Sequence, residues 1–113
     1  MLTSSTILPG VTYHPNFVSD PDETEQEIME QTELTQRSAT MGGRSYLVPR
    51  LEAWYGSHAS RFNGAAFPAR PLPPVLHALQ IRLSCYFPGV DFDGCLVNVY
   101  RDGQDSVAWH SDD

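Results

Sequence analysis

The residues best suited to do chemistry lie near the C-terminal end of the chain, where His110 and Asp112 flank Ser111. Side chains alternate between the two faces of a strand, so an extended His-x-Asp places imidazole and carboxylate on one face. Both groups suit Fe(II), and a two-histidine, one-carboxylate triad leaves open positions for substrate and oxygen. The pair indicates two ligands of an iron site. On these residues alone, a solvated histidine beside surface acids stays open as the alternative.

The surrounding sequence predicts a β-hairpin that carries this pair. Residues 96–100 are β-branched, aromatic and apolar, which is typical of a strand. Residues 101–105, Arg-Asp-Gly-Gln-Asp, are typical of a turn. Residues 106–112 form a second extended run. The two strands would therefore lie side by side.

In a regular hairpin, four polar side chains share one face. Tyr100 would project on the same side as Asn98, and His110 and Asp112 would join them from the second strand. Trp109 would fall on the opposite face, where its packing would stiffen the strand. A bulge of one residue would break this arrangement, because a slip in register moves every side chain to the other face.

Two stretches resemble the AlkB family of Fe(II)- and 2-oxoglutarate-dependent dioxygenases. The first is Asn-Val-Tyr followed by nine residues and His-Ser-Asp-Asp, at residues 98–113. The second is Val-Pro-Arg-Leu-Glu-Ala-Trp-Tyr-Gly at residues 48–56, which is similar to that family's Pro-Arg-Leu-x-Ala-Trp-Tyr-Gly segment. Residues 105–113 are also close to the corresponding stretch of the human homologues that repair alkylated nucleic acid. The resemblance covers roughly residues 45–113.

This resemblance implies how iron and cosubstrate would be held. His110 and Asp112 would be the first two Fe(II) ligands. Asn98 and Tyr100 would hydrogen-bond 2-oxoglutarate from the neighbouring strand. The alternatives are a buried, hydrogen-bonded amide for Asn98 and a core aromatic for Tyr100.

The resemblance also implies a substrate pocket for an alkylated base of DNA or RNA. Phe62 would pack against the base after it leaves the stack, as enzymes that act on bases require. Trp54 and Tyr55 would line the pocket, Arg50 would lie in or behind it, and Asp113 would meet the substrate. Packing in the core is the alternative for Trp54 and Tyr55, and a loop aromatic folded on the core is the alternative for Phe62.

The predicted fold class is β-rich α+β, an incomplete double-stranded β-helix (jelly roll) with N-terminal helices. Residues 1–44 are expected to form an acidic extension with a peripheral helix. Residues 45–113 are expected to form the front part of a dioxygenase domain, truncated after the His-x-Asp motif. The extension's helix should begin with Asp20 as N-cap, Pro21 at the first position and Glu23 completing a capping box.

Three further elements are expected between this helix and the hairpin. Residues 45–55 read as one strand and residues 57–73 as a loop. Pro74 can open an amphipathic helix, which Pro88 and Gly89 would end.

Composition limits the partners. The chain has 113 residues and a net charge of −7. Seven acids and no basic residue occupy positions 1–33, while the remainder balances seven acids with seven arginines. Scattered arginines give little electrostatic support for tight nucleic-acid binding. Cys85 and Cys95 match no metal pattern and are expected to be buried free thiols. No signal-peptide or membrane-spanning pattern is evident, which favours an intracellular protein with no membrane partner. The protein is expected to be a monomer.

The chain departs from the family pattern after Asp113. The family's second histidine ligand and the arginines that bind 2-oxoglutarate follow further downstream, and His14, His58 and His77 match no substitute position. The expectation is therefore a fragment that is inactive alone. Two alternatives stay open: a non-catalytic remnant or binding module, and a dioxygenase that acts on protein or small molecules.

Overall fold

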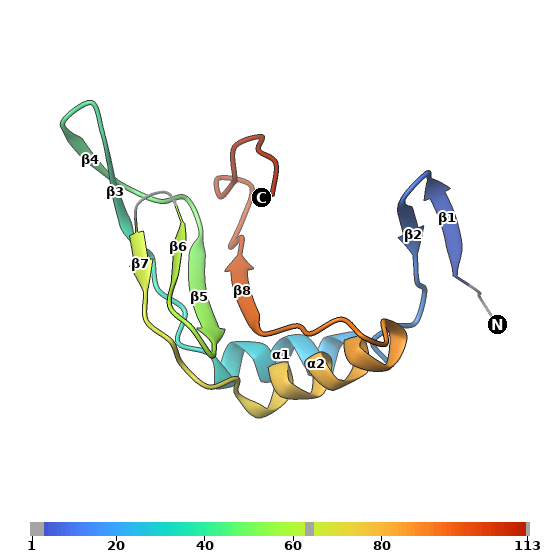
Figure 1. Cartoon of the computed structure of the whole chain (residues 1–113). Helices are drawn as coiled ribbons and strands as arrows, with labels where there is room; N and C mark the ends of the chain where they lie inside the picture. The colour runs from blue at the N-terminus through green and yellow to red at the C-terminus, as the bar shows by residue number, and fades with distance from the viewer. Residues whose placement is uncertain (1–3, 63–64, 113) are drawn as a thin grey trace.

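The structure, a computed structural model, describes residues 4–62 and 65–112. Two helices lie side by side, and β-hairpins and strands rise from them (Figure 1). Every strand pairing is antiparallel: β1 with β2, β3 with β4, β5 with β8, and β6 with β7. In chain order the elements are β1 Ser5–Leu8, β2 Val11–Tyr13, α1 Pro21–Gln31, β3 Ser38–Met41, β4 Arg44–Leu47, β5 Leu51–Gly56, β6 Ser60–Phe62, β7 Ala65–Phe67, α2 Pro74–Tyr86 and β8 Gly94–Val99.

Helix α1 begins where the sequence predicts. The Asp20 side chain accepts a hydrogen bond from the Glu23 amide at 3.1 Å, and Pro21 is the first helical residue. This contact satisfies one of the N–H groups that a helix start leaves without a partner. At the other end, the Thr32 amide and hydroxyl both donate to the Ile28 carbonyl.

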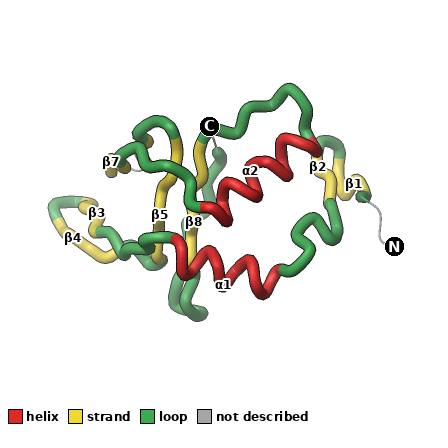
Figure 2. The backbone as a smooth tube through the Cα atoms, turned by 90° about the horizontal axis from the view of Figure 1, so that it is seen from below, coloured by secondary structure: helices red, strands yellow, loops and turns green. Residues whose placement is uncertain are grey.

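Helix α2 also begins at the predicted proline and ends at Tyr86. It runs antiparallel to α1, as the view from below shows (Figure 2). The Val75 amide donates to the side-chain oxygen of Gln31, the last residue of α1, at 2.8 Å. One helix thus supplies the partner for an unpaired N–H of the other. None of the helices in the described residues could cross a membrane.

The core lies between α2 and one face of the β5–β8 pair. Ala53 and Tyr55 of β5 pack with Val75 and Leu76 of α2, and all four are buried. Val97 and Cys95 stand opposite Ala53 and Tyr55 in the register, and both pack against this cluster. Because side chains alternate along a strand, the other face of the pair carries a different set of residues.

The prediction of a single strand over residues 45–55 is wrong, because the strand is interrupted around Pro49. β4 pairs with β3 and β5 pairs with β8, so the two halves belong to different sheets. Pro49 has no N–H to donate to a ladder. The Arg50 amide bonds back to the Val48 carbonyl at 2.8 Å, which closes a tight turn around the proline.

The loop predicted over residues 57–73 is also partly wrong. Ser60–Phe62 and Ala65–Phe67 form a short antiparallel hairpin, with Ser60 opposite Phe67. The dipeptide between them, Asn63-Gly64, is a strong sequence signal for a hairpin.

The predicted partner strand of β8 does not form. Residues 106–112 contain no strand in the described part of the chain. The Ser106 amide donates instead to the Pro49 carbonyl at 2.8 Å, so the chain leaves the turn toward the start of β5. The shared face expected for Asn98, Tyr100, His110 and Asp112 therefore does not arise from a regular hairpin.

Candidate functional site

The face of the β5–β8 pair that points away from the core carries several of the polar and aromatic side chains that could form a site. Glu52 and Trp54 of β5 alternate with the core residues, and Asn98 and Leu96 of β8 stand directly opposite them. Arg50 lies just before β5 and is buried. The sequence-predicted residues Arg50, Trp54 and Asn98 thus gather around this face, which we call the polar face.

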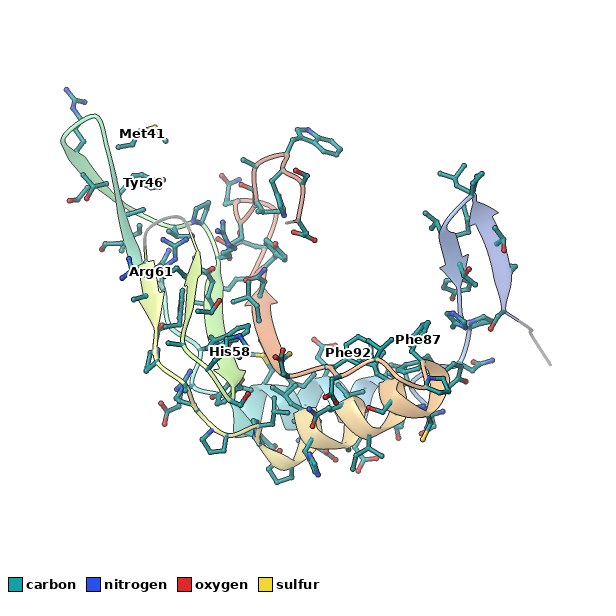
Figure 3. All side chains as sticks on the ribbon, in the orientation of Figure 1. Met41, Tyr46, His58, Arg61, Phe87 and Phe92 are labelled. Atoms are coloured by element: carbon teal, nitrogen blue, oxygen red, sulfur yellow. The ribbon has the colours of Figure 1, made fainter. Side chains whose placement is uncertain are left out.

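The Trp54 side chain lies on the polar face in close contact with two glycines. A Cβ added at Gly94 would lie 2.3 Å from the indole ring, and one at Gly56 would lie 2.9 Å from it. The indole N–H donates to the His58 carbonyl at 3.0 Å, and the two rings meet edge to face. His58 lies beside the end of β5 (Figure 3). Trp54 is therefore held in one orientation by the sheet and by the following loop.

Glu52 forms a buried ionic cluster with two arginines. Its side chain is only 2% exposed. One carboxylate oxygen lies 2.7 Å from Arg37 Nε, and the other lies 3.6 Å from Arg50 Nε. The Arg50 Nε is buried and has no hydrogen-bond partner among the described residues. Two cations thus share one carboxylate, and its removal would leave buried charge uncompensated.

Tyr55 belongs to the core face rather than to the polar face. Its hydroxyl oxygen accepts from the Glu33 amide at 2.7 Å, and the Arg70 guanidinium lies 4.3 Å from the ring centroid. Arg70 also donates to the Trp54 carbonyl. These contacts match core packing, the alternative considered for this residue.

The remaining residues predicted to contact cosubstrate or substrate are spread over several places. Asn98 is exposed on β8, and Tyr100 is exposed just beyond the end of that strand. Phe62 ends β6, but its side chain is not among those described. Asp113 lies outside the described residues.

The predicted turn at residues 101–105 is present and is closed by an ion pair. The Arg101 guanidinium donates to both carboxylate oxygens of Asp105, at 2.7 and 3.0 Å, and the Arg101 amide donates at 2.8 Å. These hydrogen bonds from the side chain and the backbone lower the pKa of Asp105 to about 2. The turn therefore has a fixed shape that does not depend on a following strand.

His110 and Asp112 face each other on the segment after this turn. His110 Nε2 lies 3.3 Å from a carboxylate oxygen of Asp112, and both side chains are largely exposed. His110 Nδ1 lies 2.8 Å from the Ala108 carbonyl, which only accepts, so Nδ1 carries the proton. Trp109, which precedes His110, is fully exposed, so the packing role predicted for it is wrong.

This geometry fits two ligands of one metal ion. Metal-ligating histidines usually donate their other ring N–H to a carbonyl or carboxylate, as His110 does to Ala108. Nε2, the ring nitrogen that the Ala108 contact leaves free, lies beside the Asp112 carboxylate, so one cation between them would meet both donors. Donors about 2.1 Å from a shared ion lie roughly 3 Å apart when adjacent, near the distance observed here.

No third ligand joins this pair within residues 4–62 and 65–112, where no cluster of three His, Cys, Asp or Glu side chains could hold a metal. The other histidines have different contacts. His58 stands 3.8 Å from Asp93, His77 contacts Gln80 on α2, and His14 meets Ser4. The donor types suit Fe(II), and a facial triad that included His110 and Asp112 would need one further ligand.

The residues that sequence reasoning missed are Glu52 and Arg37. The available signal was Glu52 itself, a charged residue inside an otherwise apolar run at residues 51–55. A carboxylate within a buried strand requires a partner. Its partner Arg37 lies 15 positions away, and no local pattern identifies it.

The free cysteines differ from each other. Both Cys85 and Cys95 are unbridged, as predicted, but Cys85 is exposed and only Cys95 is partly buried. Burial raises the pKa of the Cys95 thiol. Neither contributes to a metal cluster in the described part of the chain.

Comparison with known proteins identifies the family of this sequence. Residues 10–113 match the family model of the 2OG-Fe(II) oxygenase superfamily. The chain is 33% identical to human alpha-ketoglutarate-dependent dioxygenase alkB homolog 3, over 97% of this chain and 39% of the human protein. The rat homologue of the same name is 34% identical over 97% of this chain and 38% of its own length.

A second group of relatives carries a different name. The chain is 32% identical to the bovine DNA oxidative demethylase ALKBH2, over 84% of this chain and 36% of the bovine protein. The chain therefore spans less than two fifths of the length of these relatives. Fe(II) and 2-oxoglutarate, the predicted cofactors, are those that define the matched family. As the sequence motifs predicted, the chain belongs to the 2OG-Fe(II) oxygenase superfamily, and the relatives it matches are AlkB homologues.

Proposed function

We propose that this chain contributes the first part of the active site of an Fe(II)- and 2-oxoglutarate-dependent oxygenase. The observation that carries the proposal is the pairing of His110 Nε2 with the Asp112 carboxylate at 3.3 Å, with His110 Nδ1 bonded to Ala108. Both donors are accessible, and both are types that Fe(II) prefers. When bound, iron and cosubstrate supply the oxidising power for oxygen chemistry that side chains lack.

Asn98 and Tyr100 are the proposed binding residues for 2-oxoglutarate. An amide and a phenol can both donate hydrogen bonds to carboxylate oxygens. Both side chains are exposed and lie at or just after the end of β8. Their role in this chain is to orient the cosubstrate, not to alter its chemistry.

The proposed substrate is an N-alkylated base in DNA or RNA, and the proposed reaction is oxidative dealkylation. The names of the ALKBH2 relatives support a nucleic-acid substrate, since they are called DNA oxidative demethylases. Trp54 holds an aromatic ring in one orientation on the polar face. Aromatic rings compensate an unstacked base for lost stacking. Phe62 and Asp113 are retained as proposed substrate contacts, and Tyr55 would act by supporting the strand.

The proposed fold of the whole site is the front part of a jelly roll. Residues 45–113 would supply strands and the first two iron ligands, and residues 1–44 would form an acidic extension. Short antiparallel strands over a helical layer are consistent with this proposal. Since the described residues supply two metal ligands, we also propose that the 113-residue chain alone does not turn over.

The test is release of formaldehyde from oligonucleotides that contain 1-methyladenine or 3-methylcytosine. It is run with and without 2-oxoglutarate, on the 113-residue chain and on any longer form that contains it. The proposal predicts cosubstrate-dependent release by such a longer form, lost in His110→Ala and Asp112→Ala, and none by the chain alone. An active His110→Ala, Asp112→Ala double variant would contradict the ligand roles. Dealkylation by the chain alone would contradict its proposed inactivity.

A further inference from the structure

The buried ionic cluster on the polar face is connected to the segment that carries His110. Arg50 directs its Nε toward Glu52, as described above, and its Nη1 donates to the Ser106 carbonyl at 3.2 Å. The Ser106 amide donates in turn to the Pro49 carbonyl at 2.8 Å. Both backbone polar groups of Ser106 are thus bound by two consecutive residues, Pro49 and Arg50.

Ser106 is the first residue after the closed turn and lies four positions before His110. On its N-terminal side, the Arg101–Asp105 ion pair fixes the turn. On its C-terminal side, no helix or strand holds the chain in the described residues. The position and direction of the His110 segment therefore depend on how firmly Ser106 is held.

Arg50 can hold Ser106 only if its own side chain has one conformation. The guanidinium is buried, and its Nε lacks a hydrogen-bond partner, so Glu52 provides its compensating charge. Glu52 is itself fixed by Arg37 at 2.7 Å. Three charged side chains, Arg37, Glu52 and Arg50, are therefore linked in that order, and Arg50 binds Ser106.

The same cluster touches the strand that carries the proposed cosubstrate residue. Glu52 stands directly opposite Asn98 in the β5–β8 register. Glu52, at the centre of the cluster, thus lies opposite Asn98, and Arg50, at one end, binds Ser106 at the start of the His110 segment. Relative placement of these two parts decides whether metal and cosubstrate can be bound together.

We propose that Arg50 and Glu52 are positioning residues that hold Ser106, and so set the placement of the His110 segment relative to β8. The proposal rests on the proposed function in so far as His110 and Asp112 bind metal. Neither positioning residue touches the metal. This role differs from substrate contact in the pocket, one of the two placements that the sequence resemblance implies for Arg50.

The first test measures hydrogen exchange of the Ser106 amide by NMR. Arg50→Met keeps the length of the side chain and removes its hydrogen bonds, while Glu52→Gln keeps the shape and removes the charge. Both are expected to speed exchange at Ser106 roughly tenfold or more, without equal acceleration in α2. Arg50→Lys should rescue only in part, because an ammonium cannot serve Glu52 and Ser106 with a planar fork. Arg44→Met, in the exposed β4, is the matched control.

Ser106 exchange that stays unchanged in a folded Arg50→Met variant would overturn the proposal. If Arg50→Met fails to fold, Arg50→Lys decides, since it keeps a positive charge beside Glu52 but cannot bind Glu52 and Ser106 together.

The second test measures binding of Mn²⁺ by the broadening of His110 resonances. Arg50→Met and Glu52→Gln are expected to weaken binding several-fold, and Arg44→Met should leave it unchanged. Faster exchange at Ser106 with unchanged Mn²⁺ affinity would overturn the positioning role, while the proposed function stands. If Mn²⁺ binds nowhere near His110 in the unaltered protein, the proposed function fails. The exchange measurement then still decides whether Arg50 holds Ser106.

Discussion

Strand β5 and the segment at residues 106–112 carry the two motifs that define this chain, yet their surroundings differ. Five of the six β5 residues are buried, with the core on one side and the Trp54 and Glu52 contacts on the other. Every residue of the segment is exposed, and its described attachment to β5 runs through Ser106. The scaffold and the segment with the proposed metal ligands are therefore held in place by different interactions. Packing fixes the first, and one buried ionic cluster orients the second.

The largest expected effect comes from emptying the core beside β5. Leu76→Ala removes a buried side chain that packs on Ala53 and Tyr55, and should lower the free energy of unfolding by about 2–5 kcal/mol. Ile81→Ala, on the exposed side of the same helix, should change it by less than about 0.5 kcal/mol. Urea denaturation followed by circular dichroism measures both. Equal effects would contradict the placement of the core.

A smaller effect is expected where Trp54 lies on the sheet. Gly94→Ala places a methyl group against the indole ring and should destabilise the protein by about 1–3 kcal/mol. Trp54 fluorescence should shift, since the ring must move. Gly103→Ala, in the turn, meets no atom within 4 Å and serves as the control. If Gly94→Ala is neutral in both readouts, Trp54 does not lie over Gly94.

The turn before the segment should respond to acid. Because the folded-state pKa of Asp105 is about 2, below its usual value, the ion pair with Arg101 stabilises the turn above pH 4. That stabilisation is lost as pH falls from about 4 toward 2. Carboxyl carbon chemical shifts of Asp105 should therefore titrate near pH 2. Arg101→Met should return the Asp105 titration toward pH 4, and no change in this variant would contradict the ion pair.

The smallest expected effect separates the two thiols. Cys95, partly buried on β8 with a raised pKa, should react more slowly with a thiol reagent at pH 8 than exposed Cys85. Cys85→Ser leaves only the slow phase, and Cys95→Ser leaves only the fast one. Equal rates would mean that β8 is not packed as described.

Local sequence signals predicted the parts of the molecule that local contacts determine. Asp20 and Pro21 identified the start of α1, and Pro74 identified that of α2, because capping depends on neighbouring residues. The turn that Asp105 closes was predicted on the same basis, and the motif containing His110 indicated the family that the comparison confirmed.

Contacts between distant residues could not be predicted in this way. The chain leaves the turn toward Pro49 because Arg50 binds Ser106, a contact 56 residues apart in sequence. The strand propensity of residues 106–112 does not determine which other segment their backbone will bond to. Pro49 was a sequence signal for the end of a strand, which the prediction of one strand over residues 45–55 did not use. The burial of Glu52, by contrast, depends on the distant residue Arg37.

Mn²⁺ titration monitored by NMR tests whether His110 and Asp112 bind one metal ion. The acidic helix α1 provides a comparison within the same molecule, since its clustered carboxylates could attract Mn²⁺ without a built site. The account predicts broadening centred on His110 and Asp112 at the lowest Mn²⁺ concentrations, lost in His110→Ala and in Asp112→Ala. Broadening that starts on α1 and is unchanged in both variants would contradict it.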